Sequence, residues 1–64
     1  MKNARYIIYK VTRMEYGVIK SSEYLSWTYK TLKDARNECK KEHYSWPYYY
    51  ILRITKRGKI MYKP

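Results

Sequence analysis

The chain contains a single cysteine, Cys39, and a single histidine, His43, so it lacks the usual cross-links of a very small domain. One cysteine cannot close a disulfide within the chain, and one cysteine with one histidine cannot complete a four-ligand zinc site. A chain of 64 residues buries only about 60% of the surface that its unfolded form exposes. Its core therefore has to come from bulky side chains, and the sequence has ten tyrosines and two tryptophans. We expect one domain spanning residues 1–64, with no metal and no cofactor.

Two parts of the chain have the composition of β-hairpins. Residues 5–13 are rich in β-branched and aromatic side chains, lead to a turn at Gly17, and are followed by a returning strand over 18–20. Residues 48–56 repeat this pattern, with a turn at Gly58 and a returning strand over 59–63. After the serine pair at 21–22, large and small residues alternate, which predicts a third, short strand with Leu25, Trp27 and Tyr29 facing the core.

A helix is predicted over residues 32–43. Thr31 is followed three residues later by Asp34, which approximates a capping box. Pro47 ends the helical pattern, and the residues at i, i+3 and i+7 form one narrow apolar stripe of Leu32, Ala35 and Cys39. A helix with one apolar stripe packs on a single surface. The expected fold class is therefore α+β: a single-layer antiparallel sheet (β-hairpin, short strand, helix, β-hairpin) with one helix packed on one face.

The first strands of the two hairpins resemble each other. Residues 6–13 align without a gap on residues 49–56, with aromatic, aliphatic, cationic and hydroxyl side chains in register. Because strand side chains alternate between two faces, one set should face the helix and the other should face solvent. We expect the helix to cover Ile7, Tyr9, Val11, Tyr50, Leu52 and Ile54. This choice keeps Lys10 and Arg53 out of the core and leaves the solvent face to Tyr6, Ile8, Lys10, Thr12, Tyr49, Ile51, Arg53 and Thr55.

The net charge of +10 is concentrated at the two ends of the chain. Residues 1–13 carry four basic and no acidic side chains, residues 53–64 carry five and none, and the remaining residues carry a net charge of +1. Cations release counterions from phosphates, and aromatic rings stack on bases. The sequence thus predicts a nucleic-acid-binding accessory protein, with DNA favoured over RNA, that uses Tyr6, Lys10, Arg13, Tyr49, Arg53, Lys56, Arg57 and Lys59.

Catalysis is not indicated by any residue pattern. Cys39 lies on the apolar stripe, where a cysteine is usually a small core residue, and His43 near the helix end is expected to interact with the terminal carbonyl groups. Asp34 is a capping partner and Glu15 lies in a turn. The spacing of the carboxylates does not suggest acid–base chemistry, and a glycine-rich phosphate loop is lacking. We therefore interpret the chain as non-enzymatic, with no catalytic residues.

Residues 29–35, Tyr-Lys-Thr-Leu-Lys-Asp-Ala, follow the predicted strands and open the helix. This run resembles the strand-to-helix junction of the arm-type N-terminal DNA-binding domain of tyrosine integrases. The resemblance covers residues 5–43 and implies a three-stranded sheet that lies in the DNA major groove, with Lys10 and Arg13 as the DNA-contacting residues. The chain departs from that family by adding a hairpin over 48–63. In general style it is also similar to small phage proteins rich in lysine and tyrosine.

Two other partners fit the same surface. Tyrosine and arginine are enriched at interface hot spots, so the chain could be a phage-encoded inhibitor that binds an acidic protein surface on a host defence or replication factor, in the manner of anti-CRISPR or anti-restriction proteins. The exposed sheet face could instead form a homodimer. The sequence has no apolar run of the roughly 18–20 residues that a membrane span needs and no signal-peptide core, so we expect no membrane partner and a cytoplasmic location.

Overall fold

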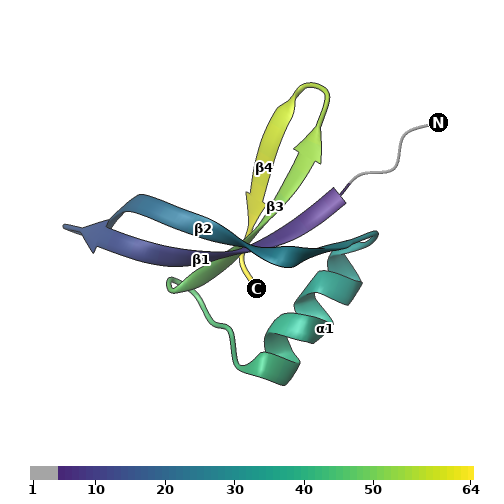
Figure 1. Cartoon of the computed structure of the whole chain (residues 1–64), viewed down its shortest axis with the longest axis horizontal. Coiled ribbons are helices and arrows are strands. Elements are labelled where there is room, and N and C mark those ends of the chain that lie inside the picture. Colours follow the sequence, from purple (N-terminus) through teal and green to yellow (C-terminus); the bar gives the residue numbers. More distant parts are fainter. Residues whose placement is uncertain (1–4) are drawn as a thin grey trace.

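The computed structural model describes residues 5–64, apart from the side chain of Ser26, and contains four strands and one helix in these residues. The elements follow the chain in the order β1 (Arg5–Glu15), β2 (Val18–Tyr29), α1 (Leu32–Glu42), β3 (Tyr49–Thr55) and β4 (Gly58–Tyr62). The strands form one antiparallel sheet in the order β2-β1-β3-β4, and α1 lies on one side of it (Figure 1). The predicted α+β class, with a single antiparallel sheet and one helix on one face, is confirmed.

The second and third predicted strands are one continuous strand. β2 runs through the serine pair and stays paired with β1, so that Ser21 lies opposite Arg13 and Ser22 opposite Val11. Shifts of register on either side of Arg13 and between Ile7 and Tyr9 absorb the irregularity. Both serine hydroxyls have partners: Ser21 Oγ lies 2.8 Å from Thr12 Oγ1, and Ser22 Oγ lies 2.5 Å from the hydroxyl of Tyr50. Pairing with the 11-residue β1 therefore outweighs the low strand propensity of serine.

The helix begins where the sequence predicts and ends one residue earlier. The backbone N–H of Asp34 donates to Oγ1 of Thr31 at 3.0 Å, which caps the first turn. At the other end, His43 adopts a left-handed conformation with φ of 62°. The following N–H, that of Tyr44, donates to the carbonyl of Cys39 at 2.8 Å. The left-handed turn at His43 therefore ends the helix before Pro47 is reached.

The core lies between α1 and the two central strands. Its fully buried side chains are Ile8 of β1, Ile51 of β3, and Ala35 and Cys39 of α1. Half-buried side chains surround this cluster: Tyr6, Leu25, Tyr29, Leu32, Tyr44, Tyr49 and Tyr62. The predicted apolar stripe of the helix is thus confirmed, and so is the inward placement of Leu25 and Tyr29, but the same prediction is wrong for Trp27, which is 70% exposed. The predicted choice of sheet face is wrong, because Ile8 and Ile51 face the helix.

The lengths of the elements explain this reversal. An 11-residue helix is about 16 Å long, whereas an 11-residue strand extends about 36 Å. The helix therefore covers only part of the sheet, and the tip of the β1–β2 hairpin projects beyond it (Figure 1). Lys10 shares the helix side of the sheet with Ile8, yet it remains exposed because α1 does not reach it. Lys10 can therefore stay out of the core even though it lies on the same side of the sheet as the helix.

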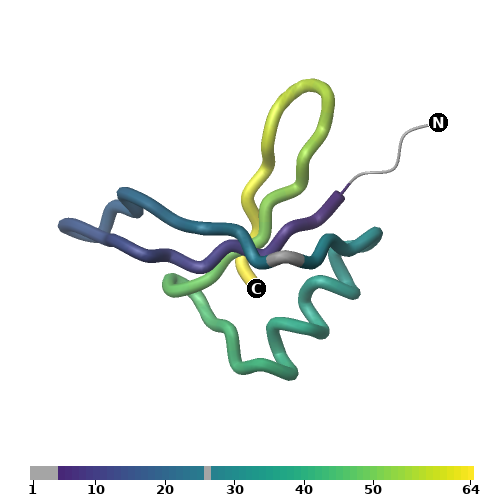
Figure 2. The backbone as a smooth tube through the Cα atoms, in the orientation of Figure 1, coloured from purple at the N-terminus to yellow at the C-terminus, as the bar shows by residue number. Residues whose placement is uncertain are grey.

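The first strands of the two hairpins, β1 and β3, are related by an approximate two-fold axis. Ile8 and Ile51 lie directly opposite each other in the β1–β3 ladder, and they are also equivalent positions in the alignment of residues 6–13 with 49–56. A two-fold rotation at this pair, perpendicular to the sheet, places β1 onto β3 in the register of that alignment. In Figure 2 the β1–β2 and β3–β4 hairpins extend in different directions from a common crossing point. The sequence similarity of the hairpins therefore has a geometric counterpart.

Candidate nucleic-acid interface

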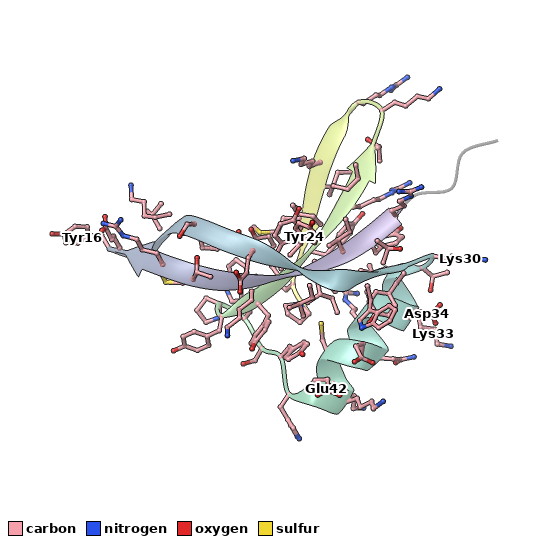
Figure 3. The ribbon with its side chains drawn as sticks, viewed as in Figure 1. Tyr16, Tyr24, Lys30, Lys33, Asp34 and Glu42 are labelled. Carbon is pink, nitrogen blue, oxygen red and sulfur yellow. The ribbon has the colours of Figure 1, made fainter. Side chains whose placement is uncertain are left out.

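The side of the sheet away from α1, here called the open face, has no helix over it (Figures 1 and 3). Residues directly opposite each other in an antiparallel ladder point to the same face, so the strand register defines its members. Three rows of side chains follow from this register: Arg5–Ile54–Lys59, Thr28–Ile7–Leu52–Met61 and Tyr24–Tyr9–Tyr50. The open face thus has cations at one end, apolar side chains in the middle and tyrosines beyond them.

The three tyrosines form a contiguous row. The rings of Tyr9 and Tyr50 stack with centroids 5.4 Å apart and an interplanar angle of 1°, and the ring of Tyr24 meets Tyr9 edge-on at 6.3 Å. Tyr50 is buried by this packing, and its hydroxyl pairs with Ser22. Tyr24 remains 67% exposed and lies on the side of the sheet away from α1 (Figure 3). The packed rings of Tyr9 and Tyr50 thus support the ring of Tyr24, which is free to stack on a ligand.

Four cations lie at the opposite end of the open face. Arg5 and Lys59 flank Ile54 in one row, and Lys56 and Arg57 form the turn between β3 and β4. All four are exposed. The turn is fixed by Thr55, whose Oγ1 donates to the carbonyl of Gly58 at 3.0 Å and accepts from the N–H of Arg57 at 3.2 Å. Arg5 and Tyr9 are four strand residues apart, or about 13 Å, so the cations and the tyrosine row can contact one extended ligand.

The acidic residues lie elsewhere, and all five are within residues 5–64. Glu23 is opposite Lys10 and points to the helix side, and Glu15 forms an ion pair with Arg13 at the far end of the β1–β2 hairpin. The other three are on α1, namely Asp34, Glu38 and Glu42. The three rows of the open face thus contain cations without carboxylates, whereas the helix side carries both kinds of charge.

Two of the predicted stacking residues are not available for stacking. Tyr6 and Tyr49 both pack against the buried cluster on the helix side. The ring of Tyr6 lies 6.2 Å from that of Tyr62, and the ring of Tyr49 stacks on Tyr44 at 4.1 Å with an interplanar angle of 15°. The prediction that these rings face solvent is therefore wrong. Their rings fill the space around the small helix residues Ala35 and Cys39.

The predicted cations divide into two groups. Lys10, Arg13 and Arg53 are not members of the three rows: Lys10 and Arg53 are on the helix side, and Arg13 lies beyond the rows, near the tip of the β1–β2 hairpin, where it is paired with Glu15. The Nε of Arg53 is buried without a hydrogen-bond partner among the described residues. The other group, Lys56, Arg57 and Lys59, lies together at the β3–β4 turn.

The open face also contains residues that the sequence reasoning did not select, above all Arg5, Tyr9 and Tyr24. The register of β1 against β2 and β3 is the observation that places these three residues on the open face. The alternation of Arg5, Ile7 and Tyr9 was visible in the sequence, but which face the helix covers depends on tertiary packing. Tyr24 becomes identifiable only when the serine pair is placed inside a continuous strand.

Chemically reactive groups are sparse in the described part of the chain. Cys39 is buried, and desolvation followed by the charge of Glu38 raises the pKa of its thiol, which lowers its reactivity. Within residues 5–64, groups of three or more potential metal ligands are absent, and α1 is too short and too polar to cross a membrane. The arrangement is suited to binding by charge and stacking.

No protein-family model, curated protein or solved structure matches this chain.

Proposed function

We propose that this protein binds nucleic acid through its open face and catalyses no reaction. The observation that carries the proposal is the exposed ring of Tyr24, which shares a face with the cations Arg5 and Lys59 while the carboxylates lie elsewhere. Each base stacked on an aromatic ring contributes roughly 1–3 kcal/mol, and each neutralised phosphate adds a salt-dependent term. An anionic polymer with planar groups satisfies both parts of the surface at once.

DNA is the favoured polymer. The β3–β4 hairpin is a two-stranded ribbon that projects from the rest of the molecule with Lys56 and Arg57 at its tip (Figure 1). The major groove of B-DNA, about 12 Å wide, admits such a ribbon, and the basic tip would contact phosphates. The resemblance of residues 29–35 to the arm-type domain of tyrosine integrases supports the same polymer, although the cations proposed here differ from Lys10 and Arg13.

Fluorescence anisotropy with labelled oligonucleotides tests the proposal. Contacts from Arg5, Lys56, Arg57 and Lys59 predict that the logarithm of the affinity for duplex DNA falls against the logarithm of the salt concentration with a slope of about −3 to −4. Parallel titrations with single-stranded DNA and RNA rank the polymers. An affinity that does not respond to salt, or no binding at low salt, contradicts the proposal.

Stacking is tested by replacing one ring. Tyr24→Ala should weaken binding to single-stranded DNA by roughly 1–3 kcal/mol, because a base loses its stacking partner. Tyr16→Ala is the matched control, since Tyr16 is fully exposed at the tip of the β1–β2 hairpin (Figure 3). Equal losses for the two variants would remove Tyr24 from the site.

A protein partner is the second candidate, and the apolar middle row of the open face favours it. Met61 is 51% exposed there and adjoins Leu52 in the ladder. Exposed apolar side chains beside tyrosines often mark protein contacts, as an inhibitor of a host defence or replication factor would need. A stoichiometric protein that stays bound after nuclease treatment and in high salt would favour this candidate. Sedimentation as a dimer would instead assign the face to a second copy.

A further inference from the structure

A separate cavity lies on the helix side of the sheet, between β2 and α1. Its volume is about 330 Å³, which is within the range of small-ligand sites. Ile8 and Leu25 provide its apolar part, and three aromatic rings line it: Trp27 and Tyr29 from β2, and Tyr44 from the segment after α1. Trp27 is 70% exposed, so the cavity opens at the surface beside its ring.

Two carboxylates also line this cavity. Glu38 and Glu42 are four residues apart and therefore lie one above the other on the same side of α1. Glu42 is in the last turn (Figure 3). They are two of only five acidic residues in a chain with a net charge of +10. Solubility alone would be served by carboxylates anywhere on the surface, so it does not explain why Glu38 and Glu42 both line the cavity.

The charge of these carboxylates reaches the aromatic rings. Burial and then the charge of Glu38 raise the pKa of Tyr29, and burial followed by the charge of Glu42 raises the pKa of Tyr44. Both carboxylates thus lie close enough to the rings for their charge to act there, and a negative charge favours a cationic ligand. The cavity and the open face therefore select ligands of opposite charge.

The lining also restricts the kind of cation. Aromatic faces attract organic cations through their quadrupoles, and cages of such rings recognise quaternary ammonium groups. A compact primary ammonium ion is strongly hydrated and would lose water against Ile8 and Leu25, whereas an alkylated ammonium group presents apolar surface together with its charge. The rings of Trp27, Tyr29 and Tyr44 are therefore suited to an alkylated ammonium group.

We propose that the cavity between β2 and α1 binds an alkylated ammonium group, held against Trp27, Tyr29 and Tyr44 and neutralised by Glu38 and Glu42. Such a group occurs on methylated lysine side chains and on free quaternary amines. Binding here is independent of the open face, because the two sites lie on opposite sides of the sheet.

Isothermal titration with three probes tests the proposal: choline, its neutral tert-butyl isostere, and a short peptide containing trimethyllysine. We expect choline or the peptide to bind saturably and at least about tenfold more tightly than the neutral isostere. Tighter binding of the peptide identifies a protein side chain as the ligand, and tighter binding of choline identifies a free amine. The proposal is overturned if neither cation binds or if the isostere binds equally well.

Matched variants locate the binding. Glu38→Gln and Glu42→Gln should each weaken cation binding several-fold by removing one charge at the cavity, whereas Glu23→Gln removes the same charge outside it. Trp27→Leu should reduce cation binding and leave DNA binding intact, and Tyr24→Leu should do the reverse. Far-ultraviolet circular dichroism confirms that each variant is folded. Equal effects of Glu38→Gln and Glu23→Gln would place the cation elsewhere.

Discussion

Ile8 and Ile51 occupy the centre of the molecule, where β1, β3 and α1 meet. Both are almost completely buried, whereas Ile7 and Ile54 on the open face are half-buried. The sequence shows the alternation of these residues but does not show which set faces the helix. The charge of Lys10 does not decide the question, because a lysine can lie on the core side of a long strand beyond the end of the helix.

Conservative core substitutions test this face assignment. Ile51→Val should lower the free energy of unfolding by about 0.5–1.5 kcal/mol, because it removes a fully buried methyl group. By the symmetry of the sheet, Ile8→Val should cost a similar amount. Ile54→Val should cost less, because the open face lets solvent replace the lost contact. Urea denaturation measures all three, and a larger loss for Ile54→Val than for Ile51→Val would mean that the helix covers the other face.

Three buried or half-buried groups predict that stability falls at alkaline pH. Burial is the largest cause that raises the pKa of Cys39 above its ordinary value of 9.0 and those of Tyr29 and Tyr44 above 10.0. The unfolded chain therefore loses these protons first as pH rises. The stabilisation is fully present below about pH 9 and is lost as pH rises through the raised pKa values.

Tyrosine-to-phenylalanine variants isolate this effect from the titration of lysines. Urea unfolding at pH 7 and pH 10.5 should show a smaller alkaline loss for Tyr29→Phe/Tyr44→Phe than for the unsubstituted protein. Tyr16→Phe/Tyr48→Phe, at two exposed positions, should behave like the unsubstituted protein. If both double variants lose stability to the same extent, the two half-buried hydroxyls do not contribute.

At the scale of elements, sequence patterns within a few residues predicted the helix correctly, whereas the full extent of strand pairing, which depends on tertiary contacts, was not predicted. Thr31, Asp34 and the apolar stripe located α1 to within one residue, because capping and periodicity are encoded over a few positions. The serine pair was misleading, because the pairing partner β1 lies outside any local window and keeps β2 continuous. The hairpin similarity has a counterpart in the structure, since the aligned residues Ile8 and Ile51 lie opposite each other in the β1–β3 ladder.

The N-cap gives a prediction at this scale. Thr31→Ala should lower the free energy of unfolding by about 1 kcal/mol, because the N–H of Asp34 loses its acceptor. Thr31→Ser keeps the hydroxyl and should be nearly neutral. Thermal unfolding followed by circular dichroism at 222 nm distinguishes them. Equal losses for alanine and serine would show that the methyl group of Thr31, rather than its cap, stabilises the helix.

At the scale of the whole molecule, the carboxylates are distributed unevenly over the two sides of the sheet. The helix side carries Glu23, Asp34, Glu38 and Glu42, whereas the cations of the open face and of the β3–β4 turn have no carboxylate among them. The concentration of basic residues at the chain ends predicted part of this arrangement, because the C-terminal cations Lys56, Arg57 and Lys59 meet at the β3–β4 turn. The rest required the strand register, which brings Arg5 beside Ile54 and Lys59.

Salt-dependent DNA binding by two charge-matched variants tests the central claim that the open face is the binding surface. Arg5→Gln/Lys59→Gln removes two positive charges from the open face, and Lys33→Gln/Lys41→Gln removes two from α1. We predict that the first variant reduces the magnitude of the duplex salt slope by about two, at ~0.9 per lost phosphate contact, and that the second leaves the slope unchanged. Equal reductions, or a larger one for the helix variant, would mean that DNA responds to net charge or to the helix side and would contradict the account.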